Sequence, residues 1–211
     1  MGRPREFDEE EILNLAMRLF WRKGYEATTM SDLVSELGLG RGSIYAAFGD
    51  KHQLFLKALD RYLQHQATLL AGALNDTAPA LPQLRRLLEV LLVTDASCGP
   101  AAGCFSVNSI AELLPHDSEV AALVSRSLDN VRAAFTTQLR RAQDTGELSD
   151  AIDAAEAARL LVTLTQGIQI TRKAAPGDPA LTGPLDLAFH LLAGRAGAAT
   201  APTAAEPEPV A

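Results

Sequence analysis

The sequence predicts an all-α protein, and two observations lead to this prediction. Alanine and leucine dominate the apolar residues, whereas aromatic residues make up only 5% of the chain, a balance that favours helices over strands. Apolar residues also recur at helical spacing in successive segments, and no alternating strand pattern competes with them. The length of 211 residues is enough for one or two domains with a substantial core.

The first helix is expected between Asp8 and Lys23. Glu11 follows Asp8 at the spacing of a capping box, and Gly24 ends the segment. The apolar residues that would form its buried face recur at helical spacing, and they are Ile12, Leu13, Ala16, Leu19 and Phe20.

Two short helices are expected next. Thr29 precedes an apolar pattern that stops at Gly38, and a second short segment runs from Arg41 to Phe48. Ile44 and Phe48 fall on one face of this second segment and would anchor it to the helices before it. Two short helices joined by a glycine-bearing turn predict a helix-turn-helix.

The rest of the chain is predicted to be helical up to a polar tail. Asp50 would cap a long helix that reaches about Leu74. The tail, residues 196–211, is rich in Ala, Pro, Thr and Glu and is expected to be disordered because it has little large apolar surface to bury. Between them, glycine, proline and aspartate separate five expected helices, at about 81–96, 104–114, 117–143, 153–174 and 179–194.

The charge and the N-terminus limit the classes of function. The net charge of −7 excludes a protein that wraps nucleic acid by bulk attraction, so any DNA contact must depend on a few placed cations and helix ends. No apolar run approaches the roughly 18 residues of a membrane span, and no signal peptide is evident. Cys98 and Cys104 do not form the pattern of a disulfide framework. We therefore expect a cytoplasmic protein without membrane contact.

The segment that begins at Arg41 has the design of a recognition helix, which places its N-terminal residues against base edges in the major groove. Arg41 can bridge the O6 and N7 atoms of guanine, and Ser43 can donate or accept a hydrogen bond. Small residues such as Gly42 let the backbone approach the groove closely. Arg41 and Ser43 are therefore the expected base-reading side chains.

Nearby groups suit phosphates. The Thr29 hydroxyl would lie at a helix N-terminus, and the Tyr45 phenol and the Lys51 ammonium are close in sequence. Arg3 and Arg5 lie in an N-terminal arm that can reach phosphates or the minor groove. Each residue also has a structural interpretation: Thr29 as a helix cap, Tyr45 as a surface tyrosine and Lys51 as a solvated charge. The arm can equally be a frayed terminus.

At these residues the sequence resembles the TetR/AcrR-type repressors. The resemblance covers about residues 7–62 and is carried by the runs GYEATTMSDL from Gly24 and LGLGRGSIYAAFGDK from Leu37. It implies an all-α homodimer whose N-terminal helix-turn-helix binds DNA and whose divergent C-terminal domain binds an inducer and forms the dimer. Repression relieved by a ligand is the implied function.

The resemblance also assigns roles to individual residues. Positions 46 and 47 are alanines and position 31 is Ser31, where many members carry larger or basic residues, so the operator sequence does not carry over from a relative. The implied phosphate contacts are Thr29, Tyr45 and Lys51, and the implied base-reading positions are Arg41, Gly42 and Ser43.

The segment after residue 65 shows no catalytic constellation, so neither an enzyme nor a cofactor is expected. No Ser or Cys nucleophile has a base at a familiar spacing, and the histidines are scattered. Asn108, Gln166 and Gln169 are the polar residues expected among apolar helix faces, where they would bind an organic ligand or satisfy backbone groups.

Cys104 is a candidate sensor. The segment from Gly103 to Pro115 resembles a helix in some TetR-like regulatory domains that lies between the inducer cavity and the DNA-binding domain. At that helix's N-terminus a thiol would be activated as an electrophile or oxidant sensor, or Cys104 would be a small buried apolar residue. Cys98, Cys104 and His116 match no common zinc pattern, so no metal site is predicted.

The last two expected helices carry more apolar residues than one buried stripe requires. Their second face would pair with a second copy in a four-helix bundle and hold two recognition helices about 34 to 36 Å apart, unless both faces are buried within one subunit. The apolar residues concerned are Leu160, Leu161, Leu164, Ile168, Leu185, Leu187, Phe189, Leu191 and Leu192.

Together these features predict an N-terminal three-helix helix-turn-helix domain followed by a C-terminal helical ligand-binding and dimerisation domain. The expected boundaries are 1–50, 51–195 and 196–211, with the helix 50–74 linking the first two parts. A ligand among the middle helices would shift this helix and lower DNA affinity. Two alternatives stay open: a thiol- or metal-responsive regulator that senses through Cys104, and a helical protein-interaction module, which the acidic charge favours.

Overall fold

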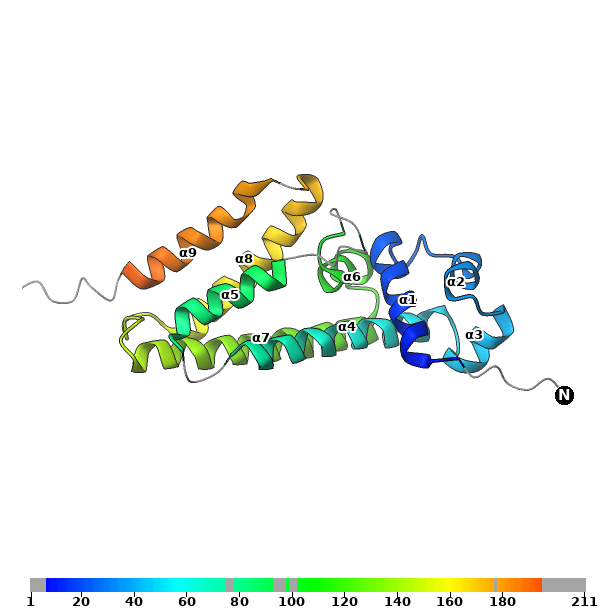
Figure 1. The fold of residues 1–211 in the computed structure, drawn as a ribbon, viewed down its shortest axis with the longest axis horizontal. Helices are drawn as coiled ribbons and strands as arrows, with labels where there is room; N and C mark the ends of the chain where they lie inside the picture. The colour runs from blue at the N-terminus through cyan, green and yellow to red at the C-terminus, as the bar shows by residue number, and fades with distance from the viewer. Residues whose placement is uncertain (1–6, 75–77, 93–97, 99–101, 177, 195–211) are drawn as a thin grey trace, which may run out of the picture.

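The computed structural model describes residues 7–74, 78–92, 98, 102–176 and 178–194. Within these ranges all regular elements are helices, as predicted. Three helices gather at one end of the molecule, and the other helices form a bundle that extends away from them (Figure 1). Arg3, Arg5 and the predicted tail 196–211 lie outside the described residues.

The N-terminal head consists of three helices at the predicted positions: α1 (Glu9–Lys23), α2 (Met30–Leu37) and α3 (Arg41–Phe48). Asp8 caps α1 by accepting hydrogen bonds from the backbone N–H groups of Glu10 and Glu11. A reciprocal capping box is present at α2, where Thr29 and Asp32 each accept from the other's backbone N–H.

The bundle starts with α4 (Lys51–Ala73), which Asp50 caps through the backbone N–H of Gln53. The remaining helices are α5 (Ala80–Leu92), α6 (Phe105–Leu113), α7 (Ser118–Asp144), α8 (Ala154–Ala174), the 3-10 helix η2 (Pro179–Thr182) and α9 (Gly183–Gly194).

One predicted helix is divided. The single helix expected at 179–194 is instead the short η2 followed by α9. Pro184 lacks a backbone N–H, so an α-helix continuing through it would leave the Ala180 carbonyl without its partner. The last four residues of the helix expected at 81–96 lie outside the described residues.

Two apolar clusters form the core. The first joins the head to the beginning of α4, to α6 and to the beginning of α7, and Phe20, Phe55 and Phe105 meet edge to face in it, with ring centroids 5.2 and 5.7 Å apart. The second cluster holds α5, α8, α9 and the end of α7 together. The first cluster contains residues from both sides of residue 50, so the head packs directly against α6.

No helix within the described ranges is long and apolar enough to cross a membrane.

Candidate functional site

Helix α3 presents a polar face to solvent. Ile44 and Phe48 are buried and fix α3 against the head. The predicted DNA-contacting residues point the other way, since Arg41, Gly42, Ser43 and Tyr45 are all exposed. The structure therefore brings these four residues together on one accessible surface at the end of the molecule (Figure 1).

Tyr45 orients Arg41 on this surface. Arg41 Nη2 lies 3.5 Å from Tyr45 Oη, and the Arg41 guanidinium carbon lies 5.8 Å from the centre of the Tyr45 ring. The second distance is within the range of a cation–π interaction. The guanidinium is thus held over the ring, at the first turn of α3.

Thr29 acts as a helix cap. Its hydroxyl donates to Asp32 Oδ2 at 2.6 Å and accepts from the Asp32 backbone N–H. Lys23 Nζ also reaches Asp32 Oδ2, at 2.5 Å. The hydrogen bond from Lys23, followed by those from Thr29, holds the pKa of Asp32 well below its usual range. The interpretation of Thr29 as a cap is correct, and a phosphate contact by Thr29 stays a prediction.

Lys51 is not a freely solvated charge. Its Nζ donates to the backbone carbonyls of Tyr25 and Thr28, at 2.8 and 3.0 Å, and lies 4.2 Å from the centre of the Tyr25 ring. Lys51, the first residue of α4, thereby fastens the loop between α1 and α2 to the start of α4. A lysine ammonium has three N–H donors, so one is left for a phosphate.

Glu112 of α6 contacts the same loop, which sequence reasoning missed. Its carboxylate accepts hydrogen bonds from the backbone N–H groups of Tyr25 and Glu26, at 3.0 and 2.8 Å. A second contact, between α4 and α7, was also not expected: His52 Nε2 of α4 lies 2.7 Å from Oδ2 of Asp117, the residue that caps α7. A lone glutamate on a helix gives no sequence signal for a contact 87 residues away.

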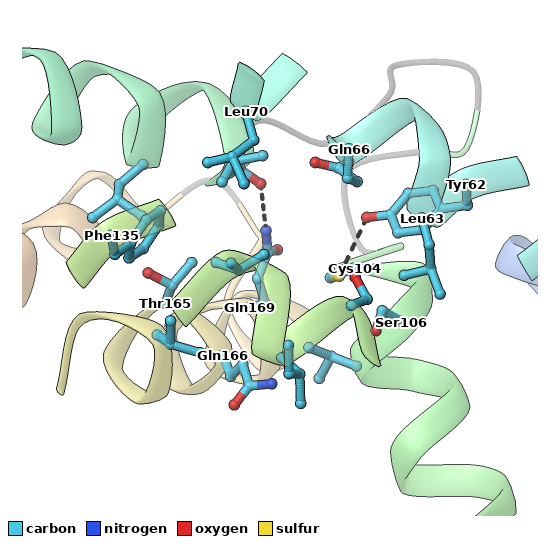
Figure 2. A pocket seen from close by; sticks show the side chains of 17 residues that line it. Tyr62, Leu63, Gln66, Leu70, Cys104, Ser106, Phe135, Thr165, Gln166 and Gln169 are labelled. Atoms are coloured by element: carbon cyan, nitrogen blue, oxygen red, sulfur yellow. Dashed lines mark hydrogen bonds between the residues drawn. The ribbon is translucent and has the colours of Figure 1, made fainter. Parts of the chain in front are cut away.

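A cavity of about 110 Å³ lies between helices of the bundle (Figure 2). Side chains from α4, α5, α7 and α8 line it, together with the segment at the start of α6. Three of the predicted ligand-binding residues, Cys104, Gln166 and Gln169, are among them.

Asn108 bonds to other protein groups and does not line the cavity, which differs from the expectation that it would bind a ligand. Its Nδ2 donates to the Ala102 carbonyl at 2.8 Å, and its Oδ1 accepts from Lys173 Nζ at 3.0 Å. Both ends of the amide therefore have protein partners, and Asn108 is not one of the residues that line the cavity. It satisfies a backbone group, which was the alternative interpretation.

Gln169 has only one end of its amide satisfied. Its Nε2 donates to the Leu91 carbonyl at 2.8 Å, a bond drawn as the dashed line from Gln169 in Figure 2. Its Oε1 has no hydrogen-bond partner within the described part of the chain, although the residue is only 5% exposed. Buried acceptors are rarely left in this state.

Cys104 forms the N-terminal boundary of α6 and carries a free thiol. Its Sγ lies 3.2 Å from Tyr62 Oη (Figure 2). Burial raises the pKa of the Tyr62 phenol well above its ordinary value, and the neighbouring Cys104 adds to this effect. Cys104 itself is partly buried, so both interpretations stay open. No group of three His, Cys, Asp or Glu side chains suited to a metal occurs among the described residues.

An apolar face is exposed on α8 and α9. It is formed by Leu160 and Ile170 of α8 and by Leu187 and Leu191 of α9, each between 55 and 60% exposed. The opposite sides of both helices pack in the second core cluster. Leu160, Leu187 and Leu191 are among the residues expected to give these helices a second apolar face, whereas Ile170 was not among them.

A helix-turn-helix head with an exposed third helix, joined to a helical bundle that contains a cavity, defines a DNA-binding regulator. Comparison with known proteins agrees. Residues 12–58 match the family of bacterial regulatory proteins called the tetR family, and residues 80–182 match the tetracyclin repressor-like C-terminal domain. The chain therefore belongs to the TetR family and is a helix-turn-helix transcriptional regulator.

The chain is similar to regulators along most of its length. It is 34% identical to the uncharacterized HTH-type transcriptional regulator YezE of Bacillus subtilis, over 71% of this chain and 77% of that protein. It is 32% identical to the HTH-type transcriptional repressor ComR of Escherichia coli, over 82% of each chain. Both relatives are transcriptional regulators.

A solved structure extends the comparison. A cysteine mutant of the TetR family transcriptional regulator CifR, complexed with double-strand operator DNA of 26 base pairs, superposes with a TM-score of 0.74 and 28% sequence identity. The superposition covers 90% of this chain and 100% of that chain.

Proposed function

We propose that this regulator binds a palindromic operator as a homodimer and represses transcription until a small-molecule inducer releases it. The observation that carries the proposal is the outward face of α3, where Arg41 and Ser43 are exposed while Ile44 and Phe48 are buried. The repressor ComR and the operator complex of CifR support it by similarity.

In the operator complex, Arg41 and Ser43 would read base edges and Gly42 would let the backbone approach the groove. Tyr45 and the remaining donor of Lys51 would contact phosphates, as would Arg3 and Arg5. Thr29 would do so after its hydroxyl turns from Asp32, to which it donates in the structure, toward the phosphate. These assignments rest on the family resemblance and on the exposure of α3.

The dimer would form through the exposed apolar face of α8 and α9. Burial of such side chains is favourable at about 25 cal/mol for each Å² removed from water. A two-fold axis through this face that runs along the length of the molecule would place the two heads at the same end of the dimer, as a palindrome requires. The apolar face is the feature of the bundle that supports a homodimer.

The inducer would act through two helices that touch both the cavity and the head. Tyr62 and Leu63 of α4 line the cavity, while Lys51 at its start holds the loop of the head. Cys104 and Val107 at the start of α6 line the cavity, while Glu112 near its end holds the same loop. A ligand that displaces either helix would therefore tilt the head, provided that it binds the DNA-incompetent state more tightly.

We further propose that residues 1–50 form the DNA-binding part and 51–195 the regulatory and dimerisation part, linked by α4. A regulator that binds an operator would act in the cytoplasm, where that DNA lies. Its head and bundle would regulate transcription through binding alone, without catalysis.

The test is selection of bound duplexes from a random DNA pool with purified wild-type protein and with the variants Tyr45→Phe and Arg41→Ala. Recovery of a palindrome by the wild type, with weaker enrichment by both variants, is expected. The variant Arg132→Ala is the matched control, since Arg132 is a partly exposed arginine of α7 that pairs with Asp129. The absence of any enriched sequence at low salt would refute the proposal.

Cys104 supports a second candidate, a thiol-responsive regulator on the same scaffold, because its Sγ lies in the cavity wall beside the Tyr62 hydroxyl. The variant Cys104→Ser separates the two candidates. If the protein senses through this thiol, the variant keeps operator binding and loses release by an alkylating electrophile. If release is unchanged, the thiol is not the sensor.

A further inference from the structure

The walls of the cavity indicate the chemistry of the molecule that it accepts. We propose that this molecule is small, neutral and mostly apolar, that it carries one hydrogen-bond donor, and that Gln169 Oε1 accepts this donor. The inference rests on the proposed function only in assigning a ligand to the cavity.

The charge of the ligand follows from the lining. Of the described residues that line the cavity, none is Asp, Glu, Lys, Arg or His, and most are Leu, Val or Phe. Transfer of an unpaired charge into such surroundings is strongly unfavourable. The described part of the wall therefore disfavours carboxylates, phosphates and ammonium groups and favours a neutral molecule.

The size of the ligand follows from the volume. The cavity measures about 110 Å³. An engineered apolar cavity of about 150 Å³ is large enough to bind benzene. A single substituted ring or a short branched alcohol therefore matches this volume after a small outward movement of the walls.

The donor follows from the fixed orientation of the Gln169 amide. The Leu91 carbonyl can only accept a hydrogen bond, so the Gln169 atom that faces it at 2.8 Å must be the Nε2 donor. Oε1 is then the end without a described partner. A buried acceptor gains most from a ligand that brings an O–H or N–H group.

Three other polar residues of the wall, Thr165, Tyr62 and Cys104, already form hydrogen bonds within the protein. The Thr165 hydroxyl donates to the Leu161 carbonyl at 2.7 Å, and Tyr62 Oη is bonded to Cys104 Sγ at 3.2 Å. Figure 2 shows the Tyr62–Cys104 pair and the hydrogen bond of Gln169 as two separate dashed lines in the wall. Gln66, Ser106, Ser127 and Gln166 also line the cavity, and Gln169 Oε1 differs from their polar atoms because it is a buried acceptor without a described partner.

The experiment uses phenol, toluene, anisole and benzoate as probes, titrated into the full chain without DNA. Binding is measured by calorimetry and by the fluorescence of Trp21, the single tryptophan, whose ring centroid lies 5.1 Å from that of the cavity residue Tyr62. Wild type is compared with Gln169→Met, which keeps the length of the side chain and removes the amide. Gln166→Met is the matched control on the same helix and the same wall.

The ratio of phenol affinity to toluene affinity is expected to be roughly tenfold higher in wild type and in Gln166→Met than in Gln169→Met. An equal ratio in all three proteins overturns the proposal, since a bound water alone would then satisfy Oε1. Wild type alone gives a second comparison that needs no substitution: anisole, in which a methyl group replaces the phenolic hydrogen, is expected to bind more weakly than phenol.

Tighter binding of anisole than of phenol, tighter binding of benzoate than of the neutral probes, or binding of none of them at millimolar concentration also overturns the proposal. Because the titration contains no DNA, these results count against the chemistry of the cavity alone. Failure of the operator selection counts against the proposed function, so the two failures are distinguishable.

Discussion

At the scale of single residues, Lys51 joins the start of α4 to the head. Its ammonium binds two backbone carbonyls of the loop between α1 and α2, and both would lose a charged donor in the variant Lys51→Met. Hydrogen bonds to charged groups contribute about 1.5 to 3 kcal/mol each when buried, and less here because the site is partly exposed.

We expect Lys51→Met to lower the free energy of unfolding by about 1 to 2 kcal/mol, measured by urea denaturation. Lys57→Met is the control, because Lys57 Nζ of the same helix lies 3.6 Å from the exposed carboxylate of Glu9 and 5.4 Å from the centre of the Phe48 ring, with no backbone carbonyl among its described partners. That control should change stability by less than about 0.5 kcal/mol. Equal effects of the two substitutions would show that the loop contacts of Lys51 contribute nothing.

Asp32 gives a pH dependence whose sign can be worked out. Its folded pKa is lowered by Lys23 and Thr29, so the carboxylate stabilises the fold above the unfolded pKa of about 3.9. This contribution is lost as the pH falls through that value toward the lower folded pKa. Stability measured from about pH 5 down to pH 3 should therefore fall more steeply for wild type than for Asp32→Asn. Parallel curves for the two proteins would contradict this assignment.

Sequence reasoning worked best for residues whose role follows from local spacing. The exposure of Arg41, Ser43 and Tyr45 could be predicted because Ile44 and Phe48 mark the buried face of a short helix. The partners of Lys51 and Asn108 could not be predicted, since they depend on which loops and helices meet in three dimensions.

At the scale of elements, α6 is the connection between cavity and head. Its first turn lines the cavity, and Glu112 in its last turn accepts from two backbone N–H groups of the head. Gly24 makes this approach feasible: its φ of +85° favours glycine, and a Cβ there would lie 3.1 Å from the Glu112 carboxylate. The boundaries of α6 were predictable from the sequence, but this contact was not.

Substitution of Glu112 tests the connection. We expect Glu112→Ala to lower the free energy of unfolding by about 1 kcal/mol, because two N–H groups lose a charged acceptor at a solvent-exposed site. Glu156→Ala is the control, since Glu156 is an exposed helix residue that pairs only with its helix neighbour Arg159 among the described contacts. Thermal unfolding of both variants measures the difference, and no difference would remove Glu112 from the account.

At the scale of the whole molecule, the exposed apolar face of α8 and α9 is the feature that one subunit leaves unexplained. Its second apolar stripe was visible in the sequence, whereas the division of the last helix at Pro184 was not expected. The fold class, the head and the order of helices were predictable because periodicity and capping are local properties.

The dimer is tested by placing a charge on this face. Leu187→Glu should dissociate the dimer at micromolar concentration, because an unpaired carboxylate would be buried in an apolar interface. Val90→Glu is the matched control: Val90 is 54% exposed on α5, compared with 57% for Leu187 on α9. Sedimentation velocity should show a monomer for the first variant and a dimer for the second. A dimer in both cases would move the interface elsewhere.

The measurement that tests the central claim most directly is the affinity for the selected operator as a function of salt concentration, determined by fluorescence anisotropy. If several phosphates are contacted, the logarithm of the association constant falls linearly with the logarithm of the salt concentration, with a slope of about −0.9 for each phosphate. We expect a steep slope for wild type and for the control Arg132→Ala, and weaker binding for Arg41→Ala. An affinity that hardly changes with salt would contradict DNA binding through α3 and would favour a protein partner for that surface.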